Sequence, residues 1–185
     1  MKRSPRTFKA VPEQMEVPSG ELARELGLPW KQTGMPRLLI GRREWVGLPD
    51  LGISPLNAKT DSGARSSSLH AEDMVLSEDG ARVTFVTVNH YGDRISCEAP
   101  VVATKKVRSS SGTAKKRVFI ETKAVLAGGF TCAIRLSLAN RSVMRCPMLI
   151  GRRALSGFFL IDPQSSHLLG GVRDLEHFVP GTRPS

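Results

Sequence analysis

From residue 37 onward the chain alternates short apolar runs with turn signals, which is typical of strands joined by tight turns. In "DMVLSEDGARVTFVTVN" two β-rich runs flank Asp79-Gly80, and this pattern predicts a hairpin. A longer pair, "KRVFIETKAVLAGGFTCAIRLSLAN", predicts a second hairpin with its turn at Gly128-Gly129. An apolar strand "PMLIG", a short helix in "RRALSG" and a last strand "GFFLID" follow. We expect an all-β, barrel-like domain with one short helix.

The two ends of the chain do not share this pattern. Residues 1–36 are rich in proline and charge, with one short helical candidate capped by Ser19. Residues 164–185 are polar and contain Pro and Gly. We expect a basic N-terminal arm or tail over 1–36, a domain over 37–163 and a C-terminal tail over 164–185.

The charge balance narrows the choice of partners. Lys and Arg number 27 against 17 Asp and Glu, a formal net charge of +10. This surplus favours acidic partners, namely nucleic acid, anionic lipid or acidic peptides. A length of 185 residues and a hydrophobic share of 40% fit one globular domain.

The sequence shows neither a targeting segment nor a disulfide framework. No run approaches the roughly 18 apolar residues of a membrane span, and the start "MKRSPRTFKAVPEQ" lacks the apolar core of a secretion signal. We therefore expect a cytoplasmic protein that does not associate with membranes. Cys97, Cys132 and Cys146 are odd in number and form no CxxC pair, so we expect small buried apolar residues.

One short stretch carries a candidate acid. In "NAKTDSGARSSSLH" the carboxylate of Asp61 is followed by Ser, Gly and Ala, a run that by itself makes ordinary turns. About eighty residues later, "PMLIGRRAL" supplies two apolar residues, Gly and Arg before the expected short helix. The two segments at this spacing resemble the half-barrel of retropepsin-like aspartic proteases.

The resemblance extends into the flanking sequence. The runs "KTDSGARSSSLHAED" and "LANRSVMRCPMLIGRRAL" are similar to those of a bacterial family of retropepsin-like aspartic proteases, also labelled ATP-dependent zinc protease. The resemblance covers roughly Arg37 to Asp162 and implies an acid-protease fold. Members are often encoded beside ATP-grasp amino-acid ligases, which implies a link to a ligase pathway.

The resemblance implies a role for each neighbour of a catalytic Asp61. Ser62 would hydrogen-bond across a dimer interface, although many relatives have Thr there. Gly63 would let the backbone approach the partner's acid, and Ala64 would leave room for substrate. The active-site loop then consists of Thr60, Ser62, Gly63 and Ala64. The segment that supports it consists of Leu149, Ile150, Gly151 and Arg152.

An aspartic protease needs two carboxylates that share one proton, because one takes a proton from water while the other polarises the scissile carbonyl. The chain contains one Asp-Ser-Gly, and its other aspartates lack the motif. The second acid must then come from another copy, so we expect a homodimer with an Asp61/Asp61 pair across its axis. The expected reaction is direct attack of water on a peptide bond, with no cofactor.

A basic segment lies between the two motifs, where retropepsins have their flap. We expect the flap tip at Ser110, Ser111, Gly112 and Thr113. Seven Lys or Arg and one Glu occur from Thr104 to Lys123, a local excess of six. Cations over the site would favour acidic or glutamate-extended peptides, with the substrate contacts expected from Lys105, Lys106, Lys115 and Lys116. A solvated basic hairpin is the plain alternative.

Other chemistries find less support in the sequence. The chain has no HExxH motif, its four histidines are scattered, and we expect no metal site; His70 is expected to support the loop after Asp61. "SGTAKK" is not a phosphate-binding P-loop, and no G-x-S-x-G elbow accompanies the run Ser66 to Ser68. A non-catalytic basic barrel that binds RNA or ribosomes stays open as the alternative, although one Tyr and two Trp offer little base stacking.

Overall fold

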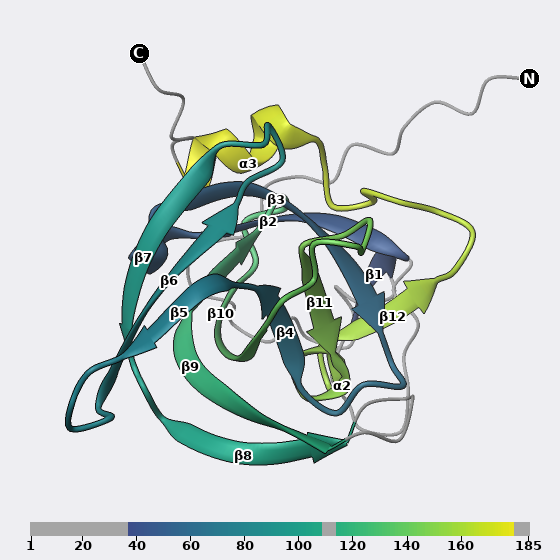
Figure 1. Ribbon diagram of the computed structural model, residues 1–185. Helices are drawn as coiled ribbons and strands as arrows, with labels where there is room; N and C mark the ends of the chain where they lie inside the picture. Colours follow the sequence, from purple (N-terminus) through teal and green to yellow (C-terminus); the bar gives the residue numbers. More distant parts are fainter. Residues whose placement is uncertain (1–36, 109–113, 180–185) are drawn as a thin grey trace, which may run out of the picture.

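The computed structural model describes residues 37–108 and 114–179, in which strands predominate (Figure 1). The expected helix at Ser19 and the expected flap tip lie outside the described residues. The elements in chain order are β1 (Leu38–Gly41), β2 (Arg43–Leu48), η1 (Pro49–Leu51), β3 (Ile53–Asp61), β4 (Ser67–His70), β5 (Glu72–Leu76), β6 (Arg82–Val88), β7 (Arg94–Pro100), β8 (Ala103–Arg108), β9 (Ala114–Leu126), β10 (Thr131–Ala139), β11 (Met148–Gly151), α2 (Arg152–Leu155), β12 (Phe159–Asp162) and α3 (Val172–Phe178).

Six strands close into a barrel, in the order β10-β4-β11-β3-β2-β9 with β9 pairing back onto β10. The thirteen residues of β9 make this closure, because its middle pairs with β10 while Val125 and Leu126 near its end pair with β2. The start of β9 pairs with β8 outside the barrel. A three-stranded sheet β5-β6-β7 and the parallel pair β1-β12 complete the fold. The predicted all-β, barrel-like architecture is confirmed.

Both predicted hairpins are present. The β5-β6 turn contains Gly80 and the β9-β10 turn contains Gly129, with φ of +67° and +80°. Side chains other than glycine rarely adopt this left-handed backbone. The short helix and last strand predicted after "PMLIG" are α2 and β12.

The structure adds a second helix, α3, to the one expected from the sequence. Leu175 of α3 is fully buried and packs with Trp45, Val125 and Val179 in a small cluster on the outside of the barrel. Figure 1 shows α3 beside β2 and β3, on the opposite side of the barrel from β8. The segment is short and mainly polar, so the helix is stabilised by the packing of a few apolar residues against the barrel strands. At seven residues it is the longest described helix, and none in the described chain could cross a membrane.

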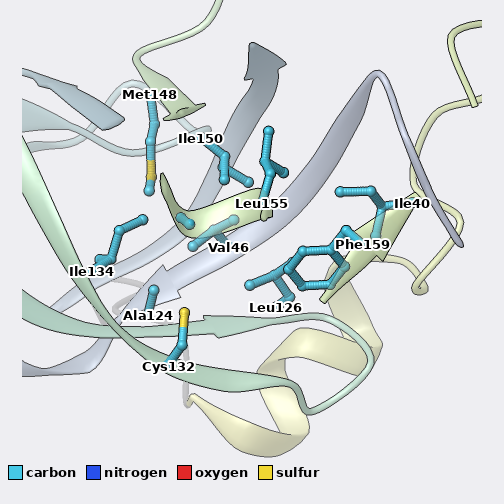
Figure 2. A pocket seen from close by; sticks show the side chains of 11 residues that line it. Ile40, Val46, Ala124, Leu126, Cys132, Ile134, Met148, Ile150, Leu155 and Phe159 are labelled. Carbon is cyan, nitrogen blue, oxygen red and sulfur yellow. The ribbon is translucent and has the colours of Figure 1, made fainter. Parts of the chain in front are cut away.

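The barrel interior is packed with apolar side chains. Ile40, Val46, Ile134, Met148 and Phe159 meet there, as Figure 2 shows. The void between them measures about 10 Å³, which is the minimum for a single water molecule. Cys132 lies on its wall. The interior is therefore a core that holds the strands in place, and the chemistry must be sought at the strand ends.

Two of the three thiols are buried, in line with the sequence expectation. Cys97 and Cys146 are buried and Cys132 is partly exposed, and all three are free. Burial raises the pKa of Cys97 to about 11, so its thiol stays protonated near neutral pH. It behaves as a small apolar side chain of the core.

Candidate active site

Asp61 is the last residue of β3, and its carboxylate shapes the turn that follows. Oδ1 accepts hydrogen bonds from the backbone N–H groups of Gly63 and Ala64, both at 3.0 Å. A Cβ at Gly63 would come within 3.3 Å of the same oxygen, so glycine fits best. Oδ2 accepts no hydrogen bond from the described part of the chain, and the side chain is half-buried. One oxygen is fixed while the other is free for chemistry.

The strand β11 runs parallel to β3 and brings Gly151 directly opposite Asp61. A Cβ at Gly151 would lie 2.4 Å from the carbonyl carbon of Ser66. The Gly151 N–H donates to Oγ of Ser67 at 3.0 Å. Only glycine allows this close approach, so the predicted contact between the two motif segments is present.

The start of α2 ties down the rest of the loop. The Arg152 backbone N–H donates to the Ala64 carbonyl at 2.8 Å, and its guanidinium reaches the Ser62 carbonyl at 3.5 Å. The Arg153 N–H donates to the Arg65 carbonyl at 3.2 Å. The backbone of the Asp61 loop is therefore held from β11 and α2.

Not every residue expected at the site faces it. The Thr60 side chain is buried and donates to the Gly41 carbonyl at 3.2 Å, which ties β3 to β1 instead of shaping the loop. Ile150 points into the barrel core, while Leu149 is half-buried and pairs with Lys59 on β3. Alternation along a strand explains this split, because successive side chains point to opposite faces.

The serine-rich run is part of the scaffold. Ser67 and Ser68 are buried in β4, and the Ser68 hydroxyl donates to the Ser137 carbonyl at 3.0 Å. The Ser137 hydroxyl returns a bond to the Ser67 carbonyl at 3.2 Å. These bonds satisfy buried hydroxyls between β4 and β10. In the described part of the chain, neither the Ser67 nor the Ser68 hydroxyl is hydrogen-bonded to a histidine.

His70 supports a different loop from the expected one. It is buried at the end of β4, and Nδ1 accepts the backbone N–H of Arg141 at 2.9 Å. Nε2 lies 3.5 Å from Oε1 of Glu72. Because Nδ1 is an acceptor, the ring proton belongs on Nε2, facing this carboxylate. His70 thus fixes the loop that joins β10 to β11, whereas the Asp61 loop is held by β11 and α2.

The two strands of the expected flap carry opposed cations. In the β8-β9 pairing Lys105 lies opposite Arg117 and Lys106 opposite Lys116. Directly opposed like charges repel, so this hairpin has a surplus of positive potential. Lys105, Lys106 and Lys116 are exposed. The tip residues 110–113 and the side chain of Lys115 lie outside the described part.

Arg141 connects these charges to the acid. Its pKa is lowered, first by burial and then by the positive charge of Arg117, while Cys146 and the Asp61 carboxylate act in the opposite direction. The guanidinium therefore lies within the electrostatic reach of both the hairpin and the acid. Arg141 was missed as a candidate site residue, since nothing in a linear sequence marks a cation that interacts with Asp61 only after folding.

Comparison with known proteins identifies the family and the fold of the chain. The family model described as "Retropepsin-like aspartic endopeptidase RimB" matches residues 39–169. A crystal structure of a Legionella pneumophila protein of unknown function aligns with a TM-score of 0.59 at 28% identity, over 71% of this chain and 97% of that one. The fold is thus shared along nearly the whole of that protein.

Longer proteins also contain a related segment. A "Probable alpha-L-glutamate ligase" of Parasynechococcus marenigrum is 40% identical over 142 residues, which is 74% of this chain and 30% of the relative. A protein of the same name from Shewanella pealeana is 36% identical over 145 residues, 76% of this chain and 31% of the relative. The chain spans under a third of these curated relatives, and most of their length lies outside the match.

Proposed function

Because the chain belongs to the RimB-like family of retropepsin-like aspartic endopeptidases, we propose that it hydrolyses peptide bonds with Asp61 as its catalytic acid. One observation carries the proposal. Asp61 is fixed through Oδ1 to the N–H groups of Gly63 and Ala64, with Gly151 closely packed behind the loop, while Oδ2 accepts no hydrogen bond from residues 37–108 and 114–179. A preorganised carboxylate of this kind suits repeated proton transfer.

The second carboxylate is proposed to come from another copy of the chain. The sequence contains one Asp-Ser-Gly, and a twofold axis beside the loop would bring Asp61 against its symmetry mate. Two carboxylates at close range share one proton and titrate as a pair. Ser62, whose side chain is exposed at the tip, would take part in the contact between the loops.

The shared proton lets one carboxyl group act as the base while the other acts as the acid. The ionised Asp61 takes a proton from water as the water oxygen bonds to the scissile carbonyl carbon, while the protonated mate hydrogen-bonds to the carbonyl oxygen. The mate gives its proton to the carbonyl oxygen as the tetrahedral diol forms. On collapse the C–N bond breaks, Asp61 returns its proton to the leaving nitrogen, and a diol hydroxyl gives a proton back to the mate, so the dyad again holds one proton. The carboxyl pair supplies every proton transfer.

For the substrate we propose acidic or glutamate-extended peptides. The support is the opposed cations of the β8-β9 hairpin, the position of Arg141 near Asp61, and the glutamate ligase name of longer relatives. Removal of residues that such a ligase adds would place the two activities in one pathway. The lysines at 105, 106, 115 and 116 would then steer acidic chains toward the site.

An unbiased peptide-library digest tests the proposal. The wild-type protein should cleave a subset enriched in acidic peptides, and Asp61→Asn should cleave none while keeping its circular dichroism spectrum. Cleavage that survives in Asp61→Asn would exclude the mechanism. RNA binding by both proteins without any cleavage would favour the non-catalytic barrel instead.

A further inference from the structure

A second recess lies beside the middle of β3, where Asn57, four residues before Asp61, lines it. Its volume is about 390 Å³, and Asn57, His70 and the loop between β10 and β11 form part of its wall. Arg43, Arg141 and Arg145 also line it. No Asp or Glu is among its lining residues. The apolar void in the barrel core shares no lining residue with it.

The charge of this pocket is uncompensated. Within residues 37–108 and 114–179, no carboxylate oxygen lies within 4.0 Å of the guanidinium groups of Arg43, Arg141 or Arg145. Arg141 is partly buried, and its Nε donates only to the Cys146 carbonyl, at 3.5 Å. Partly buried cations are costly unless an anion pairs with them. Guanidinium groups bind carboxylates in a planar, two-pronged geometry.

Asn57 adds an acceptor to this set of donors. Asn57 lines the pocket, and its Oδ1 is buried with no hydrogen-bond partner among the residues that the structure describes. A buried acceptor without a partner costs about 1–3 kcal/mol, which a ligand N–H group would recover. A phosphate ion has no N–H group to donate. A peptide residue with a carboxylate offers an anion for the arginines and a backbone N–H for Asn57.

The position of Asn57 relates this pocket to the acid. Residues 57, 59 and 61 of β3 point to the same face because side chains alternate along a strand. Four residues of strand span about 13 Å, and an extended peptide covers the same length in about four residues. Arg141 lines the pocket and also lies within the field of Asp61. An extended peptide held at Asp61 is therefore long enough to reach this pocket.

We propose that this pocket is a distal subsite, which binds a peptide residue that carries a carboxylate beside an amide N–H, about four residues from the scissile bond. The carboxylate pairs with the arginines and the N–H donates to Asn57. This assignment rests on the proposed function for its placement relative to a scissile bond. The carboxylate has two sources, a free C-terminus or the side chain of Asp or Glu.

Binding of four synthetic peptides to the full chain carrying Asp61→Asn tests the subsite without cleavage. One peptide has a free C-terminus and neutral side chains, one a single Glu and a C-terminal amide, and one a C-terminal amide and no acid. The fourth repeats the tighter binder with its adjacent amide N-methylated. We expect one acidic peptide to bind about tenfold more tightly than the neutral one, which identifies the source, and N-methylation to weaken it several-fold.

Matched arginine variants then locate the site. Arg145→Gln should weaken the acidic peptide about tenfold, whereas Arg173→Gln removes the same charge from the exposed face of α3 and should change binding less than about twofold. Equal losses in both variants, or equal binding of acidic and neutral peptides, would overturn the subsite. Wild-type cleavage with no such selectivity would leave the protease proposal standing, and selective binding without any wild-type cleavage would overturn the protease and keep the pocket.

Discussion

Gly151 lies directly opposite Asp61 at the ends of two parallel strands, and this pairing positions the acid. The space behind the loop is so narrow that an added Cβ at 151 would come within 2.4 Å of Ser66. Packing at this point therefore couples the strand β11 to the geometry of the carboxylate. The relationship joins two sequence segments far apart along the chain.

Replacing Gly151 with Ala should damage the site more than the fold. The new methyl group must push the backbone at Ser66 and Ser67 away, which breaks the bond from the Gly151 N–H to the Ser67 hydroxyl. We expect a loss of about 1–3 kcal/mol in the free energy of unfolding, measured in urea, and a loss of peptide cleavage of at least about tenfold.

Gly171→Ala is the matched control. An added Cβ there would meet only the Asp174 side chain, at 3.7 Å, an ordinary van der Waals contact. This variant should cost about 1 kcal/mol or less, because Ala is a poorer helix N-cap than Gly, and should leave cleavage unchanged. Equal activity in the two variants would show that the packing behind the loop does not position Asp61.

Mixing experiments test the shared acid pair. If one active site needs Asp61 from two chains, wild-type protein refolded with an equal amount of Asp61→Asn should form mixed dimers that are inactive. Activity per wild-type chain should then fall to about half, the value for random pairing. Activity that stays constant would mean that each chain works alone. Sedimentation of both proteins at the assay concentration checks that pairing occurs.

The structure also contains a buried carboxylate other than the proposed catalytic acid. Glu44 is fully buried and accepts the backbone N–H groups of Gly41, Leu168 and Leu169 at 2.6, 3.0 and 3.3 Å. It joins the turn between β1 and β2 to the segment that leads into α3. Burial raises its pKa above 4.5, and the three N–H groups only partly oppose this effect.

The raised pKa sets the direction of a pH dependence. The folded state keeps the Glu44 proton at pH values where the unfolded chain has lost it, so this residue's contribution to stability falls as pH rises from 4.5 through the raised pKa. Glu44→Gln places an amide donor against a backbone donor and should cost about 1–3 kcal/mol. The difference from wild type should be largest near pH 4.5 and shrink above it in urea titrations. The same titration of the exposed Glu78→Gln serves as the control, and a constant difference for Glu44→Gln would contradict the assignment.

Much of this organisation could be predicted from the sequence because it depends on local patterns. The turns at Gly80 and Gly129 and the strand before α2 follow from residue types at close spacing. The pairing of the two motif segments, which lie far apart along the chain, was expected only from the family resemblance. The role of His70 could not be predicted, because its partner Arg141 lies 71 positions away and bonds through its backbone. The helix α3 was missed for a similar reason, since its few apolar residues are stabilised by a barrel surface that forms elsewhere.

The charge of the β8-β9 hairpin gives the last test, which concerns the substrate. Lys106 lies opposite Lys116, and Lys105 opposite Arg117. The like charges of each pair repel one another, and a bound anion would reduce this repulsion. Exposed charges contribute about 1 kcal/mol or less per pair and are screened over about 8–10 Å, yet several together can change selectivity about tenfold. Cleavage of acidic peptides should therefore fall as salt is raised, and combined Gln substitutions at 105, 106, 115 and 116 should slow acidic substrates more than neutral ones. The ratio of kcat/KM for paired acidic and neutral peptides measures the effect.

An equal loss for both peptides, or no salt dependence, would leave these lysines as a solvated surface. RNA-binding assays on the same variants would then test the non-catalytic alternative.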